Sequence, residues 1–338
     1  MRKLFAGVVV AVIFVIGAIL LWPAPNSGLV VYSGLDYGPA VAAAFTKETG
    51  IKVTIVRLST GSLLARIVSQ GKHPAWDLAW FDGATAAMSL DQAGLLAHHL
   101  PAPADLTAIG TTMLSPQGAY IPTGMTLAGV FIYDPARLAT PPTSWNDLPQ
   151  PAYRGQVGMN DPSISGPTYP MLAGMLSNAG GWPQGQGYVE ALKANDLHMF
   201  DKNDATLAAL QSQAISLAIV QSSAAVYFAA MHPALKIIFP SPAFVLPNVM
   251  VEAADLKAPQ RADAARFIAF VMRPDIQKLR QTHGEADGDY WPITADAPTP
   301  LPGLPALRTL NTVTLNPAHW GGLESAINSW FAEAMAGS

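Results

Sequence analysis

Short hydrophobic runs alternate with amphipathic stretches from residue 29 onward. The runs at Leu29–Tyr32, Lys52–Leu58 and Asp77–Phe81 predict strands. Each is followed by a helical pattern. The first has Val41, Ala44 and Phe45 as its apolar stripe and ends near Gly50, and the other two cover about 63–70 and 84–92. This βαβαβα order predicts an α/β fold with a parallel sheet and right-handed crossovers.

Small, polar or acidic residues follow each of the three predicted strands. Because the carboxyl ends of parallel strands meet at one edge of a sheet, we expect these side chains to converge there. They are Ser33, Ser59, Thr60, Ser62 and Asp82.

A second α/β set occupies the middle of the chain. Two long strand-like stretches, Tyr120–Tyr133 and Ala243–Val251, flank it. Two α/β units joined by two such stretches predict two lobes with a ligand cleft between them. The first lobe would hold residues 29–121 plus 250–338, and the second would hold residues 122–249. Within them we expect strands at about 156–159 and 215–220, and helices at about 168–179, 187–195, 204–213, 224–231, 258–272, 274–283 and 322–334.

The first 28 residues predict a targeting segment. Arg2 and Lys3 precede an uncharged apolar run, Leu4–Trp22, close to the ~20 residues that span a bilayer. A cleaved signal and a retained anchor both remain open. Either places the rest of the chain outside the inner membrane, in the periplasm.

Composition narrows the functional classes. The net charge is −4 and no Lys/Arg cluster stands out, so nucleic acid is not an expected partner. The chain has no cysteine, which excludes disulfides, thiolate metal sites and cysteine nucleophiles. None of its seven histidines has the spacing of a zinc motif, and no nucleophile elbow or phosphate loop occurs, so we expect no enzyme, cofactor or metal site.

Several motifs lie in order along the chain. They are Val30–Gly34 (VVYSG), Phe45–Val53, Asp77–Asp82, Ala93–Leu96, Pro142–Leu148, Tyr153–Val157, Asp161–Gly166 and Tyr290–Pro292. Together they resemble the extracellular solute-binding proteins of ABC importers, near the ferric-iron, thiamine, sugar-phosphate and 2-aminoethylphosphonate binders. The resemblance implies a type II periplasmic-binding fold and a monomer that closes two lobes on a small solute and delivers it to a membrane permease.

Two loops are the main candidates to hold the solute. Ser59, Thr60, Gly61 and Ser62 open a predicted helix, where hydroxyls and free amides attract oxyanions. Plain capping is the alternative role. On the second lobe the corresponding residues are Ser163, Ser165 and Gly166.

Further candidates lie at the same rim. Asp82 suits a ligand amine, or else caps the next helix. Ser33 and Tyr37 follow the first strand, and Gln221, Ser222 and Ser223 follow a strand of the second lobe. The expected solute is an anion or a zwitterion resembling a phosphonate or phosphate ester, with any amine facing Asp82.

Three alternatives remain open. Ferric binders of the family use adjacent tyrosines where this chain has Ser222–Ala225, although Asp36, Tyr37, Asp82 and Tyr227 offer oxygen ligands. A membrane-tethered sensory binder and an envelope enzyme on a similar fold are the others. The acidic stretch His283–Asp289 lacks calcium-loop spacing and predicts a solvated loop.

Overall fold

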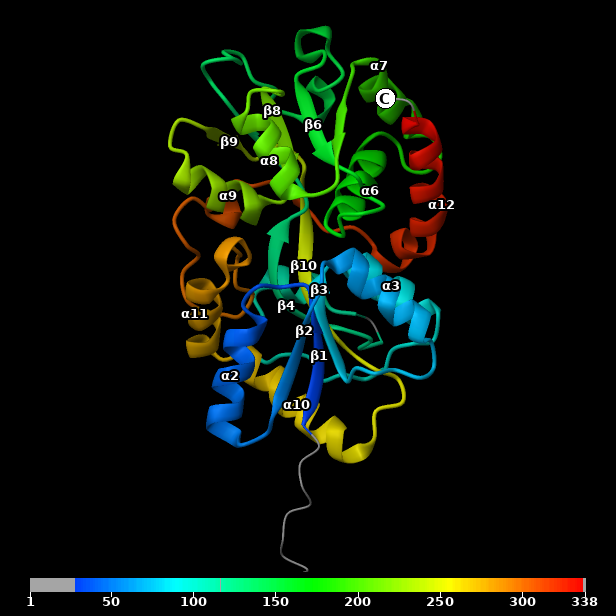
Figure 1. Cartoon of the computed structure of the whole chain (residues 1–338), viewed down its shortest axis with the longest axis vertical. Coiled ribbons are helices and arrows are strands. Elements are labelled where there is room, and N and C mark those ends of the chain that lie inside the picture. The colour runs from blue at the N-terminus through cyan, green and yellow to red at the C-terminus, as the bar shows by residue number, and fades with distance from the viewer. Residues whose placement is uncertain (1–27, 116, 337–338) are drawn as a thin grey trace, which may run out of the picture.

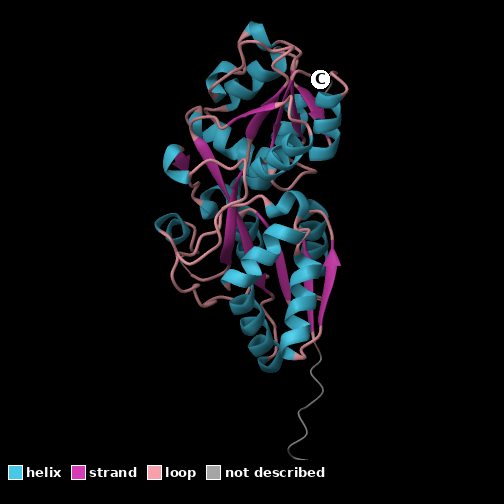
Figure 2. Cartoon of the chain, turned by 90° about the vertical axis from the view of Figure 1, so that its left-hand side faces the viewer, coloured by secondary structure: helices cyan, strands magenta, loops and turns pink. Residues whose placement is uncertain are grey.

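The computed structural model describes residues 28–115 and 117–336, and its two sheets lie end to end in an elongated, two-lobed molecule (Figures 1 and 2). Lobe 1 is built on a sheet with strand order β11-β10-β3-β1-β2, and β4 pairs with β10. Lobe 2 is built on a sheet of order β7-β6-β8-β5-β9. Within the described residues no helix is long and apolar enough to cross a membrane. The predicted segment 4–22 lies outside them.

The first half of lobe 1 follows the predicted alternation. Strands β1 (Leu29–Ser33), β2 (Val53–Arg57) and β3 (Leu78–Asp82) are parallel, and all of β3 is buried. Between and after them come α2 (Gly38–Thr49), α3 (Thr60–Gln70) and α4 (Ala84–Gln92). The carboxyl ends of the three strands therefore share one edge, which faces lobe 2 (Figure 1).

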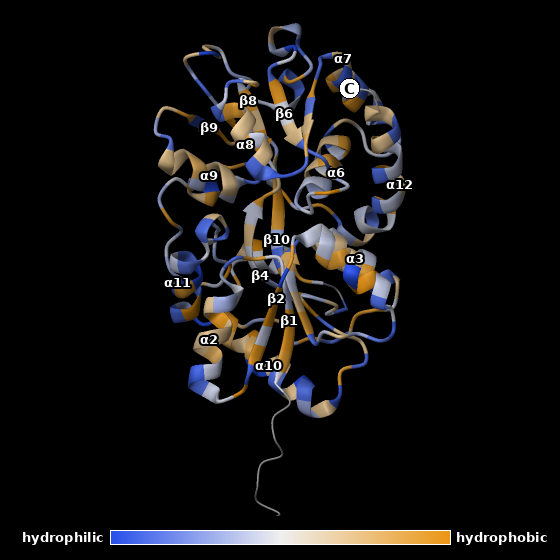
Figure 3. Cartoon of the chain, viewed as in Figure 1, coloured by the Kyte–Doolittle hydropathy of each residue, from blue (hydrophilic) through white to orange (hydrophobic). Residues whose placement is uncertain are grey.

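Helices cover both faces of the lobe 1 sheet, which explains why its strands are almost wholly apolar. One face packs against α2, α10 (Ala258–Val271) and α11 (Pro274–His283). The other packs against α3 and α4. Figure 3 shows β1 and β2 in mostly hydrophobic colours, while hydrophilic residues lie on the surrounding helices and loops.

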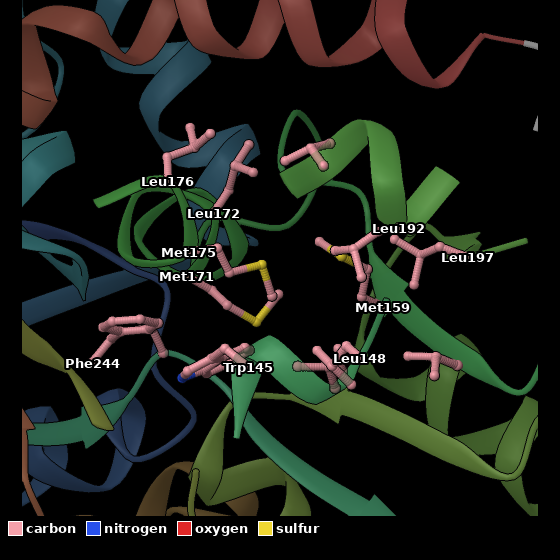
Figure 4. Close-up of a cluster of buried hydrophobic side chains, with 14 of the residues drawn as sticks. Trp145, Leu148, Met159, Met171, Leu172, Met175, Leu176, Leu192, Leu197 and Phe244 are labelled. Atoms are coloured by element: carbon pink, nitrogen blue, oxygen red, sulfur yellow. The ribbon is translucent and has the colours of Figure 1, made fainter. Parts of the chain in front are cut away.

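Lobe 2 has a mixed sheet. Strands β7 (His198–Phe200), β6 (Val157–Asn160) and β8 (Leu217–Val220) are parallel, while β5 (Val130–Tyr133) is antiparallel to β8 and to β9 (Lys236–Ile238). Its helices are α6 (Thr168–Asn178), α7 (Gln186–Ala194), α8 (Asn203–Gln211) and α9 (Ser222–Met231). In its core Trp145 stacks on Phe244 beside Met171 and Met175 (Figure 4).

The stretch 120–133 is two strands, so the prediction of one long strand was wrong. Strand β4 (Ile121–Leu127) belongs to lobe 1, and β5 begins at Val130 in lobe 2. At the break a side chain on Gly129 would run into Met171 and Trp145, so the chain turns where its backbone presses on the lobe 2 core. Strand β10 (Ala243–Glu252) returns, buried along its length and antiparallel to β3 and β4.

A third connection links the lobes. After β11 (Thr312–Val313), helix α12 (Pro317–Met335) begins earlier than predicted, because Asn316 caps its first turn. It packs against α4 of lobe 1 and α6 of lobe 2, and its second half lies in the lobe 2 core. The predicted boundaries at 121/122 and 249/250 stay a proposal, in which β4 and β10 are the two crossing segments and α12 bridges the two bodies.

The short elements complete the chain. Helix α5 (Ala108–Thr112) precedes β4, and four 3-10 turns lie at η1 (Trp145–Asp147), η2 (Pro151–Tyr153), η3 (Glu285–Gly288) and η4 (Leu307–Thr309). The acidic stretch 283–289 is not a solvated loop, because η3 packs against α9 and Asp289 is buried.

Arg280 on α11 is a fully buried cation in lobe 1. It donates to Thr123 O at 2.7 Å and to the Tyr37 hydroxyl at 3.0 Å. Its guanidinium carbon lies 4.4–5.1 Å from the ring centroids of Tyr37, Trp80 and Tyr290. Ring faces and neutral acceptors thus replace the water that a guanidinium normally requires.

Arg280→Met should lower the free energy of unfolding by about 3–5 kcal/mol, since it removes the ring contacts and leaves two buried acceptors without donors. Chemical denaturation measures the change, and Arg308→Met at an exposed position is the control. A loss below about 1 kcal/mol for Arg280→Met would show that the guanidinium is not a structural anchor.

Candidate functional site

The lobes meet where the two candidate loops face each other. A Cβ built on Gly61 would lie 2.7 Å from Ile164 O, and one on Gly166 would lie 2.5 Å from Thr60 Cβ. Residues 59–62 at the start of α3 and residues 163–166 before α6 are therefore in contact. The structure brings together the two loops that the sequence proposed, and they touch across the junction of the lobes.

The start of α3 combines hydroxyls with free amides. Ser59 Oγ accepts from Ser62 N at 3.3 Å and donates to Ser62 Oγ at 2.9 Å, so the predicted cap is present. Ser59 and Ser62 remain exposed, while Thr60 is buried against Gly166. The first-turn amides have no partner within the helix and carry its partial positive charge. This end of the site suits an oxyanion.

The facing loop is less open to an anion. Asp161 Oδ1 accepts from Ser163 N at 2.8 Å and from Ser163 Oγ at 2.6 Å, so its carboxylate takes both donors. Ser165 Oγ accepts from Asn160 Nδ2 at 3.2 Å. The Asp161 charge and these bonds leave the α3 side as the stronger anion site.

Asp82 ties three parts of the molecule together. It ends β3 with 4% of its surface exposed and accepts from Gln221 Nε2 of lobe 2 at 3.2 Å and from Asn248 Nδ2 of β10. Gln221 Nε2 also donates to Thr126 Oγ1 of β4 at 3.0 Å. Burial raises the pKa of Asp82 to about 6, although the two amide hydrogen bonds oppose that shift.

Two more carboxylates lie beside Asp82. Asp36 N donates to Asp287 Oδ2 at 2.7 Å, and Asp36 pairs with Arg57, whose Nη2 is 3.9 Å from Asp287 Oδ2. Burial, and then the charges of Asp82 and Asp36, raise the pKa of Asp287 well above its usual value. Asp36 and Asp287 therefore share the Arg57 guanidinium, and the buried Asp82 already accepts two amide hydrogen bonds, so this side of the junction is rich in carboxyl groups.

Sequence reasoning missed Asp287, Arg57 and Asn248 as members of this group. Arg57 is the last residue of β2, so its position at the carboxyl end of a strand could have indicated that it lies at the site. Asp287 and Asn248 come from distant segments, and only the folded sheet and η3 bring them to Asp82 and Asp36.

Four predicted residues offer no surface to a solute in this structure. Ser33 Oγ bonds the amide and carbonyl of Leu35, and Tyr37 OH accepts from Arg280. Ser222 Oγ accepts from Leu127 N at 2.9 Å, which joins α9 to the end of β4, and Ser223 is buried beside it. Their contacts hold the walls of the site together.

The described residues contain no group of three or more His, Cys, Asp and Glu side chains placed to hold a metal ion. Of the tyrosines named for iron, Tyr37 is buried against Arg280, and Tyr227 is partly exposed on α9.

A family model described as "Bacterial extracellular solute-binding protein" matches residues 40–306. This chain belongs to that family. Its members and the similar solved structures are transport binding proteins, and the predicted type II periplasmic-binding fold is confirmed.

Three solved structures illustrate the likeness. Iron-bound HitA from Pseudomonas aeruginosa is 20% identical with a TM-score of 0.75, and the match covers 91% of this chain and 99% of HitA. AfuA from Actinobacillus pleuropneumoniae, with fructose-6-phosphate bound, is 15% identical with a TM-score of 0.77 over 92% and 99% of the chains. The periplasmic binding protein P5PA is 18% identical with a TM-score of 0.78 over 91% and 100%.

Gly166→Ala should oppose lobe closure in this solute-binding protein, because its Cβ would lie 2.5 Å from Thr60 Cβ. We expect a larger radius of gyration by small-angle X-ray scattering and an unfolding free energy within about 0.5 kcal/mol of the original protein. Gly187→Ala is the matched control in lobe 2, since nothing lies within 4 Å of its added methyl group. Equal radii for the two variants would contradict a direct loop contact.

Proposed function

We propose that this protein is the substrate-binding component of an ABC-type importer and captures a small zwitterionic organic solute, an amine that carries a phosphonate or phosphate-ester group. It acts in the periplasm as a monomer that delivers the solute to an inner-membrane permease, and residues 4–22 target it there or anchor it to the membrane. The observation that carries the proposal is the opposite chemistry of the two ends of the closed site.

The oxyanion end is the start of α3. Ser59 and Ser62 supply exposed hydroxyls beside first-turn amides, and Thr60 and Gly61 bring that turn against lobe 2. A solute held at the start of α3, beside the loop 163–166, contacts both lobes, so its binding energy favours the arrangement in which the two loops meet.

The cation end is the carboxyl group of Asp82 with Asp287 and Asp36. An ammonium there relieves the repulsion between Asp82 and Asp287 and replaces part of the hydration that burial removes. Arg57 balances only part of this charge. A simple anion would not use this end, and ferric iron is less well supported because no metal-holding group occurs among the described residues.

A thermal-shift screen tests the class of solute. We expect 2-aminoethylphosphonate to stabilise the protein more than ethylphosphonate, which lacks the amine, because only the first can occupy both ends. At about 100 times its dissociation constant a ligand adds ~2.7 kcal/mol of stability. Stabilisation by ferric salts, thiamine or polyamines alone would overturn the proposal.

The triple change of Ser59, Thr60 and Ser62 to Ala should weaken binding of both phosphonates by several kcal/mol, since hydrogen bonds to charged groups contribute roughly 1.5–3 kcal/mol each. Calorimetry measures the affinity. Ser69→Ala, on an exposed turn of the same helix, is the control. Unchanged affinity of the triple variant would reject this end of the site.

Asp82→Asn should weaken 2-aminoethylphosphonate binding by roughly 100-fold and spare ethylphosphonate. The pKa of Asp82 in the empty site is about 6, so below pH 6 the carboxyl group must lose a proton before it can pair with the amine. Affinity for the amine therefore falls below pH 6 by up to about tenfold per pH unit more in the original protein than in Asp82→Asn, once the pH dependence shared with ethylphosphonate is subtracted. Equal losses for both ligands would reject the amine pairing.

A further inference from the structure

A separate cavity of about 740 Å³ lies between the lobes, beside the crossing strand β10. Its walls come from α4 and α5 of lobe 1, from Val245–Pro247 of β10, from Pro170 of lobe 2 and from the segment 312–317 that leads into α12. None of the residues proposed to hold the solute lines it. It is therefore not part of the site described above.

The cavity has an apolar side and a polar side. No charged side chain lines the cavity, and an apolar wall is formed by Ile109, Met113, Leu114, Leu246 and Leu315. Uncharged polar side chains also line it, namely Thr112, Tyr120, Thr312, Thr314 and Asn316. The first turn of α4 adds its backbone amides, because its cap is Gly83 and it has no side-chain capping bond. Thr85 in that turn is 4% exposed and lines the cavity, and its hydroxyl has no hydrogen-bond partner.

An uncapped helix start and a buried hydroxyl without a partner both favour a ligand with an acceptor group. We propose that this cavity is a second small-molecule site for an anionic amphiphile, with its oxyanion at the start of α4 and its apolar body along α5 and Leu246. The partial positive charge of the helix start serves the anion, since no lysine or arginine lines the cavity.

The cavity is also coupled to lobe closure. At Gly83 the three parts of the molecule converge, because an added Cβ would lie 3.6 Å from Pro170 Cγ of lobe 2 and 3.9 Å from Leu246 Cδ1 of β10. A ligand that contacts these walls gains its lobe 2 contacts only when the lobes are in this closed arrangement. It therefore binds the closed state more tightly and shifts the population toward it.

The probe is 8-anilinonaphthalene-1-sulfonate, a sulfonate on an apolar ring system, titrated into the full-length protein and excited directly. Thr112→Trp adds a large side chain at the α5 wall of the cavity, and Thr111→Trp is the matched control, because both threonines are exposed and only Thr112 lines the cavity. We expect one saturable site in the original protein and in Thr111→Trp, and at least tenfold weaker binding in Thr112→Trp with an unchanged melting temperature. Equal binding by both variants, or no saturable binding, overturns the site.

The coupling has its own test, which needs no solute and so stands or falls apart from the proposed function. Gly166→Ala opposes closure at a contact outside the cavity, so it should weaken probe binding at least threefold relative to Gly187→Ala. Equal affinities in these two variants would overturn the coupling to closure.

Discussion

A buried carboxylate at the junction of the lobes is the interaction that ties the two sheets and the crossing strand together. Asp82 ends a strand of lobe 1 and accepts hydrogen bonds from a lobe 2 side chain, Gln221, and from Asn248 of the crossing strand. Burying such a charge is costly unless donors surround it, so the carboxylate favours the geometry in which both amides reach it. The same residue, Asp82, therefore influences both how the two lobes are positioned and the charge at their junction.

The charges around the cleft extend this constraint. Asp36 and Asp287 place negative charge beside Asp82, and Arg57 offsets part of it. The start of α3, with its free amides, lies in contact with the facing loop of lobe 2 at Gly61 and Ile164. The proposed site thus has a direction, which is the basis for proposing a solute with separated charges of both signs.

The sequence predicts the parts of the fold that local patterns specify. The alternation of strands and helices in lobe 1 and the capped start of α3 follow from apolar periodicity and from Ser59. The break at Gly129 was not predictable in this way, because it results from packing against Met171 and Trp145. Local apolar and β-prone residues continue through the break and give no sign of it.

The candidate site also has residues that local sequence patterns indicate and residues that only distant contacts bring into place. Ser59, Ser62 and Asp82 could be proposed from the sequence because the ends of parallel strands share an edge. Asp287 was missed because its neighbour Asp36 is 251 residues away in the chain. Ser33 and Tyr37 occupy the expected strand end, but Ser33 is consumed by its own turn, and the buried Arg280 holds Tyr37 in the core. Position along a strand was predictable, whereas the direction of each side chain depended on distant partners.

The bridging helix α12 has a mechanical consequence for the whole molecule. Its first turns rest on α4, where Gly321 lets the two backbones come close, and its later residues Ile327 and Phe331 are buried in the opposite lobe. If only the two crossing segments, β4–β5 and β10, joined the lobes, the lobes could rotate about those segments without any other restraint. Here any rotation of one lobe relative to the other must also shift or bend α12, which is packed against both lobes. The extent to which the lobes can open is therefore limited by how far α12 can slide along α4.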